Sequence, residues 1–167
     1  MELVVAGCAD REGSKRGALT GPNPTDRAKS GSKRHLLIDG RGVPLGQKLS
    51  GANVHDKWGA LPTVDDVKRN APSRRKRPTH CCGDKGYDFA DVDRGLRARG
   101  IEPHIARRGE AHRSCRRGRP RRWKVERTQS WHNRFRALLI RWEVKPANYY
   151  ALFCLASALI AYRVALW

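Results

Sequence analysis

The segment His80-Cys-Cys-Gly-Asp-Lys-Gly-Tyr-Asp88 decides the fold that we expect for this chain. Its first four residues suit a short buried strand, and the strand ends directly on an acid. Gly86 permits a tight turn, which would leave the Asp84 carboxylate at the edge of a sheet. The pattern therefore predicts a strand whose carboxyl end carries a candidate metal ligand. On composition alone, Asp84 or Asp88 could equally cap a helix that starts near Ala90, as Asp commonly does.

The residues before this segment predict three more strands and a helix. Glu2–Ala6 is apolar and partly β-branched, as in a buried strand. His35–Ile38 and Val43–Leu49 flank a turn rich in Asp and Gly, which is typical of a β-hairpin. Asp56–Lys68 predicts a helix, which is broken before Pro72.

The residues after the segment predict a further strand among helices. Ala90–Arg99 indicates a helix that stops at Gly100, and Ile101–Ile105 indicates a fifth strand. Arg121–Trp142 predicts an amphipathic helix. The last helix, Pro146–Trp167, is apolar nearly all round, so we expect it to be buried in this core or against a partner. The order predicts one α/β domain over residues 1–167, with a mixed sheet and two C-terminal helices.

The charge of the chain points to a polyanionic partner. Thirty-five Lys and Arg residues outweigh 16 Asp and Glu residues, which gives a net charge of +19. Basic loops are expected at 11–33 and 107–122. Nucleic acid is the default partner of such a chain, although a solvated basic surface or a ribosomal type of RNA binder would share its composition. The residues expected to contact phosphate are Lys33, Arg34, Arg107, Arg108, Arg116, Arg117, Arg119, Arg121 and Arg122.

The cysteines do not predict a disulfide framework or a zinc site. Their number is five, which is odd, and they are scattered, which fits a reducing cytoplasm. His80, Cys81 and Cys82 precede His112 and Cys115, but adjacent cysteines lack the spacing with which a chain wraps around tetrahedral zinc. A membrane is not expected, because the uncharged run at 146–162 is shorter than the roughly 20 residues that a bilayer requires.

Glu126 is a second candidate for metal chemistry. Arg122, Glu126 and Asn133 share one helical face, although an ordinary Arg–Glu pair would have the same spacing. Glu126 points away from the apolar stripe, most of which begins at Trp131. We therefore expect this stripe to pack against the terminal helix, while the first turns lie at the sheet edge. Trp123 and Trp131 could stack on an unpaired base, but the place of Trp131 in the stripe favours a core role.

Five blocks of the sequence, in this order, resemble the insertion-sequence-five group of DDE transposases. The resemblance runs from about Leu19 to the C-terminus. The blocks are Thr20-Gly-Pro-Asn-Pro-Thr-Asp26, Gly31-Ser-Lys-Arg-His-Leu-Leu-Ile-Asp-Gly-Arg-Gly-Val-Pro-Leu45, Gly51-Ala-Asn-Val-His-Asp56, Asp84-Lys-Gly-Tyr-Asp88 and Arg122-Trp-Lys-Val-Glu-Arg127.

This resemblance implies an RNase H-like fold and the cleavage and joining of DNA with two Mg²⁺ or Mn²⁺ ions. Asp84 matches the second catalytic acid of the family, Glu126 the third, and Arg122 the arginine that precedes the third acid. The implied partners are insertion-sequence ends and target duplex, in the nucleoid of a bacterial cytoplasm. A homo-oligomer formed through the C-terminal helix is a further expectation.

The sequence departs from the family where its first catalytic Asp ends the first strand. Ala6 and Gly7 hold that place, and Asp10 would serve only if the strand shifted its register by about three residues. The helical region that precedes this strand in the family is absent before Glu2, which predicts a truncated or decayed reading frame. We therefore expect an impaired transposase, and the alternative is a remnant that binds DNA without cutting it.

Overall fold

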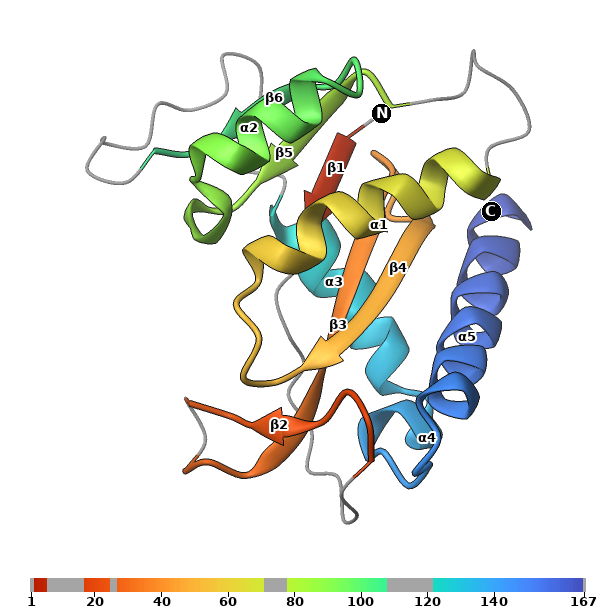
Figure 1. Ribbon diagram of the computed structural model, residues 1–167. Coiled ribbons are helices and arrows are strands. Elements are labelled where there is room, and N and C mark those ends of the chain that lie inside the picture. Colours follow the sequence, from red (N-terminus) through yellow and green to blue (C-terminus); the bar gives the residue numbers. More distant parts are fainter. Residues whose placement is uncertain (1, 6–16, 25–26, 71–77, 108–121, 167) are drawn as a thin grey trace.

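The computed structural model describes residues 2–5, 17–24, 27–70, 78–107 and 122–166, and one of its sheets is entirely parallel (Figure 1). Strand β1 (Glu2–Val5) pairs with β5 (His80–Gly83), and β5 pairs with β6 (Glu102–Ile105). Val5 lies opposite Gly83, and Gly83 lies opposite Ile105. The carboxyl ends of all three strands therefore meet at one edge of this sheet.

The second sheet is antiparallel. It consists of β2 (Gly21–Pro22), β3 (Ser30–Ile38) and β4 (Pro44–Gly51), in that order. In the hairpin turn between β3 and β4, the Asp39 carboxylate accepts hydrogen bonds of 2.8 Å from the backbone nitrogens of Arg41 and Val43. Gly42 has a φ of 93°, a conformation that suits glycine. Strand β1 contacts β3, so the two sheets lie side by side.

The helices largely follow the sequence prediction. Helix α2 is followed by a turn that ends at Gly100, which has a φ of 74°, so the chain leaves the helix where expected. A short 3-10 helix, η2, was not predicted. The helical segments are α1 (Lys57–Asn70), η2 (Lys85–Tyr87), α2 (Ala90–Arg97), α3 (Arg122–Asn133), α4 (Arg136–Leu139) and α5 (Pro146–Leu166).

Strand β3 separates two layers of helices. Leu37 belongs to a buried cluster with residues of α1 and α2, such as Val64 and Leu96. Its neighbours Leu36 and Ile38 point to the opposite side, into a cluster with residues of α3, α4 and α5. Alternate side chains of a strand face opposite sides of a sheet, so this pattern gives a three-layer arrangement. The expected α/β architecture is confirmed, and helices pack on both sides of β3.

The structure corrects one expectation about the C-terminal helices. The predicted single helix over Arg121–Trp142 is interrupted between α3 and α4, where Phe135 has an extended backbone, and Trp142 is 63% exposed. Helix α5 buries one face in the core, where Phe153 and Ile160 lie, and leaves Leu155 59% exposed.

Helix α5 continues past the uncharged run at 146–162 and ends at Leu166, close to its predicted end. With 21 residues, it is long and apolar enough by length and composition to cross a membrane. A core helix of a soluble protein passes the same test, and Tyr149, Phe153 and Ala156 pack into the cluster with Leu36 and Ile38.

Candidate active site and nucleic-acid interface

Asp84 occupies the sheet edge that the sequence predicted. It follows the last residue of β5 and begins η2, and its exposed carboxylate accepts a hydrogen bond of 2.7 Å from the Lys85 nitrogen. Its backbone is extended, with φ of −75° and ψ of 164°. Asp84 therefore caps η2 rather than α2, whose cap position is held by Phe89 without a side-chain bond.

The end of β1 lies beside Asp84, but the candidates for the first acid lie outside the described residues. Because Val5 pairs with Gly83, the end of β1 lies next to the residue that precedes Asp84. Ala6, Gly7 and Asp10 lie outside the described residues. Within the described ranges, no group of three His, Cys, Asp or Glu residues is placed to hold a metal ion.

Glu126 lies on an exposed part of α3, and α3 is fixed to the hairpin turn between β3 and β4. Lys124 Nζ donates to the Gly40 carbonyl oxygen at 2.6 Å, and Thr128 Oγ1 donates to the Gly42 carbonyl oxygen at 2.9 Å. Helix α3 also contacts β1. The helix that carries Glu126 thus lies against the strand whose end is beside Asp84.

The faces with which α3 contacts its neighbours agree in part with the sequence prediction. Val125, which is 2% exposed, packs with residues of α5 such as Phe153. On the face that includes Glu126, the Asn133 Oδ1 accepts a hydrogen bond of 2.7 Å from Arg34 on β3. At the C-terminal end of α3, the face that includes Glu126 is therefore turned toward β3.

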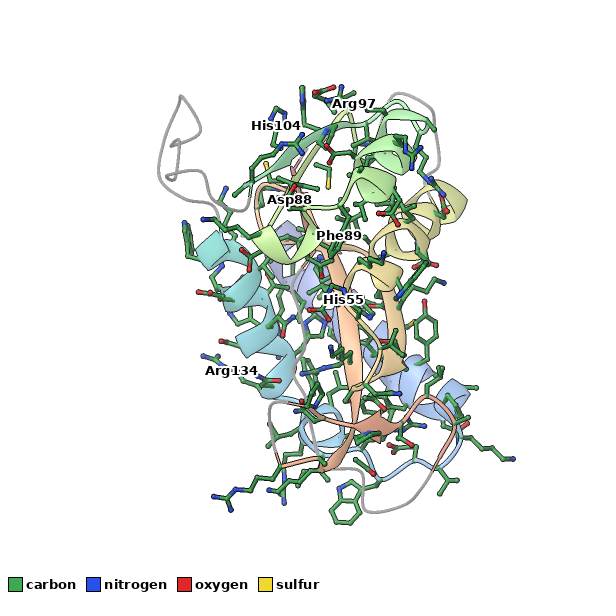
Figure 2. The ribbon with its side chains drawn as sticks, turned by 60° about the vertical axis from the view of Figure 1, so that its left-hand side comes forward. His55, Asp88, Phe89, Arg97, His104 and Arg134 are labelled. Carbon is green, nitrogen blue, oxygen red and sulfur yellow. The ribbon has the colours of Figure 1, made fainter. Side chains whose placement is uncertain are left out.

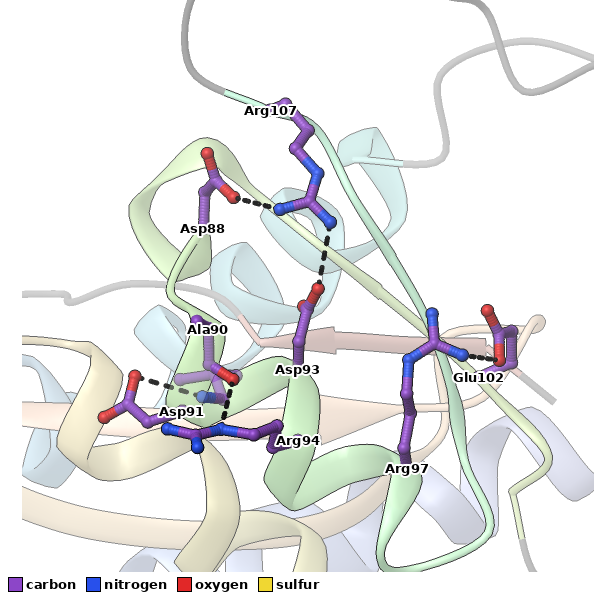
Figure 3. Close-up of polar contacts among 9 residues, drawn as sticks. Asp88, Ala90, Asp91, Asp93, Arg94, Arg97, Glu102 and Arg107 are labelled. Carbon is purple, nitrogen blue, oxygen red and sulfur yellow. Dashed lines mark hydrogen bonds and ion pairs between the residues drawn. The ribbon is translucent and has the colours of Figure 1, made fainter.

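Arg107 holds the loop after η2 instead of standing free (Figure 3). Its Nη1 lies 3.4 Å from Asp88 Oδ1, and its Nη2 lies 3.2 Å from Asp93 Oδ2. The residue that follows Asp88 is Phe89, whose ring packs edge-on against His55, with ring centroids 5.2 Å apart (Figure 2). These contacts fix the segment that begins at Asp84 from two sides.

Two residues expected to contact phosphate are engaged within the protein. Arg34 is 2% exposed, so its place in β3 does not support a contact with DNA. Lys33 Nζ donates to Asp56 Oδ1 and to the Val54 carbonyl oxygen, both at 3.0 Å, and its side chain is 12% exposed. The charge run alone could not separate these residues from surface cations, because β3 is covered on both sides.

The remaining residues expected to contact phosphate lie largely outside the described residues. Arg108, Arg116, Arg117, Arg119 and Arg121 fall in 108–121, and for Arg122 only its place at the start of α3 is described.

Trp123, Arg127 and Trp131 form a stack along the exposed side of α3. The Arg127 guanidinium carbon lies 4.7 Å from the ring centroid of each tryptophan. Trp123 is 48% exposed, whereas Trp131 is half-buried, so the expected core role of Trp131 is not confirmed.

The two adjacent cysteines face opposite sides of the parallel sheet. Cys81 is 2% exposed within the cluster around α1 and α2, and burial raises the pKa of its thiol far above the ordinary value. Cys82 is partly exposed. The two residues thus cannot act together in the zinc site that spacing already disfavoured, and His112 and Cys115 lie outside the described residues.

Comparisons with known proteins identify the family. The family model described as "Transposase DDE domain" matches residues 6–161. The chain belongs to the DDE transposases. It is 44% identical over 150 residues, 86% of this chain and 69% of the relative, to the transposase assigned to insertion sequence element IS402 of Burkholderia cepacia. The resemblance drawn from the sequence blocks is confirmed, and DNA transposition is the general function of this transposase family.

Sequence reasoning missed the buried polar residues that hold the transposase domain together. Arg141 is 3% exposed, and its guanidinium donates to Ser32 Oγ at 2.6 Å and to the Ala18 carbonyl oxygen at 2.9 Å. His132 is 1% exposed and contacts Ser157 on α5. Neither residue stands in a recognisable motif, so only the fold reveals them.

Proposed function

We propose that this chain is the catalytic domain of an insertion-sequence transposase, with Asp84 and Glu126 as two of its metal-binding acids. The observation that carries the proposal is the placement of Asp84 at the edge where β1 and β5 end, with the Glu126 helix against β1. Metal-dependent phosphoryl transfer on DNA requires carboxylates that converge on such an edge.

An RNase H-like sheet is the arrangement that best accounts for these contacts. Since β1 contacts β3, the two sheets would form one mixed sheet in the order β4, β3, β1, β5 and β6. Helices α1 and α2 would cover one face, and α3 and α5 the other. We propose that residues 1–167 form this single domain.

The two acids fit the donor preference of Mg²⁺, which binds carboxylate oxygens. When bound, the ions would activate the attacking oxygen and stabilise the leaving oxygen of the DNA backbone. Asp84, exposed and held by the Lys85 nitrogen, would supply one ligand, and Glu126 would supply another. Arg107 would keep the Asp84 turn in place through Asp88.

DNA is the proposed substrate, and the basic residues after Arg107 are proposed to bind its phosphates. Both insertion-sequence ends and target duplex would be bound, in the nucleoid of a bacterial cytoplasm. The support is the net charge of +19, together with the membership of the transposase family. Arg34 is left out of this interface because it is buried.

We further propose that the chain is impaired in cleavage, because Ala6 and Gly7 stand where the family has its first acid. Loss of one of three carboxylates removes a charge that holds and spaces the ions. The second candidate function, a remnant that binds DNA without cutting it, rests on this same pair of residues.

The test is to incubate the purified chain with end-containing duplex and Mn²⁺, beside the variants Ala6→Asp, Gly7→Asp and Asp10→Ala. We expect no cleavage by the unaltered chain and recovery of metal binding in Ala6→Asp or Gly7→Asp. Cleavage by the unaltered chain that disappears in Asp10→Ala would assign Asp10 as the first acid. Absence of cleavage and of restored metal binding in every variant would favour the remnant.

The exposed side of α5 is the proposed contact between two copies. Leu155, Leu159, Tyr162 and Leu166 are 42–67% exposed and follow one another at helical spacing. Such a stripe suits a symmetric helix pair. Light scattering of the wild type and Leu159→Glu should give dimer and monomer, respectively, and a wild type that is monomeric at all concentrations would exclude the contact.

A further inference from the structure

Two histidines meet across the parallel sheet, at the opposite end of β5 from Asp84. His80 begins β5, and His104 lies in β6. His80 Nδ1 and His104 Nε2 are 3.0 Å apart, and the ring centroids are 5.2 Å apart with an interplanar angle of 37°. Both residues are exposed, and Figure 2 shows His104 near the end of the molecule where Arg97 also lies.

The strand register explains why these imidazoles share one face. Cys81 points into the core cluster with α1 and α2, so its neighbours His80 and Cys82 lie on the other face of β5. Cys82 is the register partner of His104, and His104 therefore stands on that same face. Since strands β5 and β6 are hydrogen-bonded neighbours, the backbone holds the Cα atoms of the two histidines at a fixed spacing.

We propose that His80 and His104 form a surface site for a late first-row divalent cation of the Ni²⁺ and Cu²⁺ class. With metal–nitrogen bonds of about 2.0–2.1 Å, a nitrogen separation of 3.0 Å corresponds to an angle of roughly 90° at the ion. This angle suits square-planar or tetragonal coordination by nitrogen and oxygen, which Ni²⁺ and Cu²⁺ prefer, better than it suits tetrahedral zinc.

Binding requires the two rings to turn. In the metal-free pair the two nitrogens share a hydrogen bond, so each exposed ring must rotate for both lone pairs to converge on one ion. Water fills the other coordination positions, because the described residues contain no group of three His, Cys, Asp or Glu placed around an ion.

This site differs from the carboxylate site in both place and chemistry. Asp84 follows the end of β5 and His80 begins it, so the two residues are about 13 Å apart along the strand at 3.3 Å per residue. Imidazole nitrogens favour Ni²⁺ and Cu²⁺, whereas carboxylate oxygens favour Mg²⁺. The proposal therefore does not depend on the transposase chemistry.

The test is titration of the full chain with Ni²⁺ by isothermal calorimetry, without oxygen, at a pH of about 7.5, where free imidazole is neutral. Ni²⁺ is chosen because the free thiols of this chain would reduce Cu²⁺. The variants are His80→Asn, His104→Asn and the double substitution. His55→Asn is the matched control, because His55 is exposed and Asn can still accept the hydrogen bond that the Lys57 backbone nitrogen donates to His55 Nδ1.

We expect each single substitution at His80 or His104 to weaken one Ni²⁺ site by on the order of tenfold or more, and His55→Asn to leave it unchanged. Ni²⁺ should raise the melting temperature of the wild type but not of the double variant, because the ion joins two strands only in the folded chain. Mg²⁺ in large excess should not displace Ni²⁺.

Several results would overturn the proposal. Equal Ni²⁺ affinity in the wild type and the double variant would place any binding elsewhere, for example on His112 and Cys115. Loss of the site in Cys82→Ser, with retention in the double histidine variant, would assign it to the thiol. A folded double variant, shown by an unchanged circular dichroism spectrum, makes either result decisive.

Discussion

His132 Nε2 lies 2.9 Å from Ser157 Oγ, which joins the helix that carries Glu126 to the long helix α5. The other ring nitrogen, Nδ1, lies 2.9 Å from the Thr128 carbonyl oxygen, so it must carry the proton of the neutral ring. Ser157 Oγ is also 2.6 Å from the Gln47 side chain on β4. One buried histidine thus ties α3, α5 and β4 together.

Stability should fall in mild acid because of this histidine. Burial lowers the pKa of His132 from 6.5 to about 4. Below pH 6.5 the unfolded chain binds a proton at this histidine, whereas the folded chain does not. The contribution of His132 to the free energy of unfolding is therefore complete above pH 6.5 and is lost as the pH falls toward 4. The loss over this window is on the order of 3 kcal/mol, measured as the free energy of unfolding in urea at each pH.

The control for this prediction is His132→Gln, which cannot titrate. Its stability should be lower than wild type near neutral pH but should change less between pH 6.5 and 4. Burial also lowers the pKa of His35, so some dependence of the same sign will remain in the variant. Parallel profiles for the two proteins would show that His132 is not the titrating group.

Gly42→Ala should loosen the docking of α3. Gly42 has a φ of 93°, and a Cβ there would lie 2.8 Å from Arg127 Nη2 and 3.0 Å from Thr128 Oγ1. We expect a loss of about 1–3 kcal/mol in the free energy of unfolding. Gly40→Ala is the matched control in the same turn, because a Cβ at Gly40 meets nothing within 4 Å. Equal losses for the two variants would refute the steric argument.

Arg141→Lys should destabilise the domain although the charge is kept. The guanidinium donates hydrogen bonds to Ser32, to the Ala18 carbonyl and, at 3.0 Å, to the Glu143 carbonyl. One ammonium group cannot reproduce this set of hydrogen bonds. The expected loss is about 2–3 kcal/mol in the free energy of unfolding. Arg136→Lys, at an exposed position, should cost little. An unchanged free energy of unfolding for Arg141→Lys would contradict the role of these hydrogen bonds.

The affinity for duplex DNA should fall steeply with salt, and the slope should identify the contacting residues. Neutralising Arg116, Arg117, Arg119 and Arg121 together should flatten the plot of log affinity against log salt concentration. Arg107→Gln should leave the slope nearly unchanged, because Arg107 is paired with Asp88 and Asp93. Fluorescence anisotropy measures both slopes. If the fourfold variant keeps the wild-type slope, the loop does not touch phosphate.

Much of the fold could be predicted because its signals are local. The turn after Ile38, the glycine at position 100 and the apolar strand that ends on Asp84 each determine their own neighbourhood. The break between α3 and α4 has no such signal. It is stabilised by distant contacts, such as the 3.0 Å hydrogen bond from the Tyr149 hydroxyl to the Leu138 carbonyl. The apolar residues keep a helical spacing across this break, so the sequence predicted one continuous helix.

The candidate site divides in the same way. Asp84 was located correctly at a strand end, since a strand followed by an acid and a glycine leaves few alternatives. The charge of Arg34 was taken for a surface charge because composition contains no information about which strand is covered on both sides. The ion pairs of Arg107 depend on η2, a 3-10 turn that the sequence did not indicate.

The parallel pairing of β1 with β5 has a consequence for synthesis on the ribosome. Glu2 finds its partner at His80, whereas β3 and β4 are joined by a short turn. At roughly 5–20 residues per second, the first strand waits on the order of 4–16 s before its partner is made. The hairpin can close long before that. The nascent chain therefore carries a β-strand without its hydrogen-bonding neighbour for seconds, a state in which chaperone binding competes with aggregation.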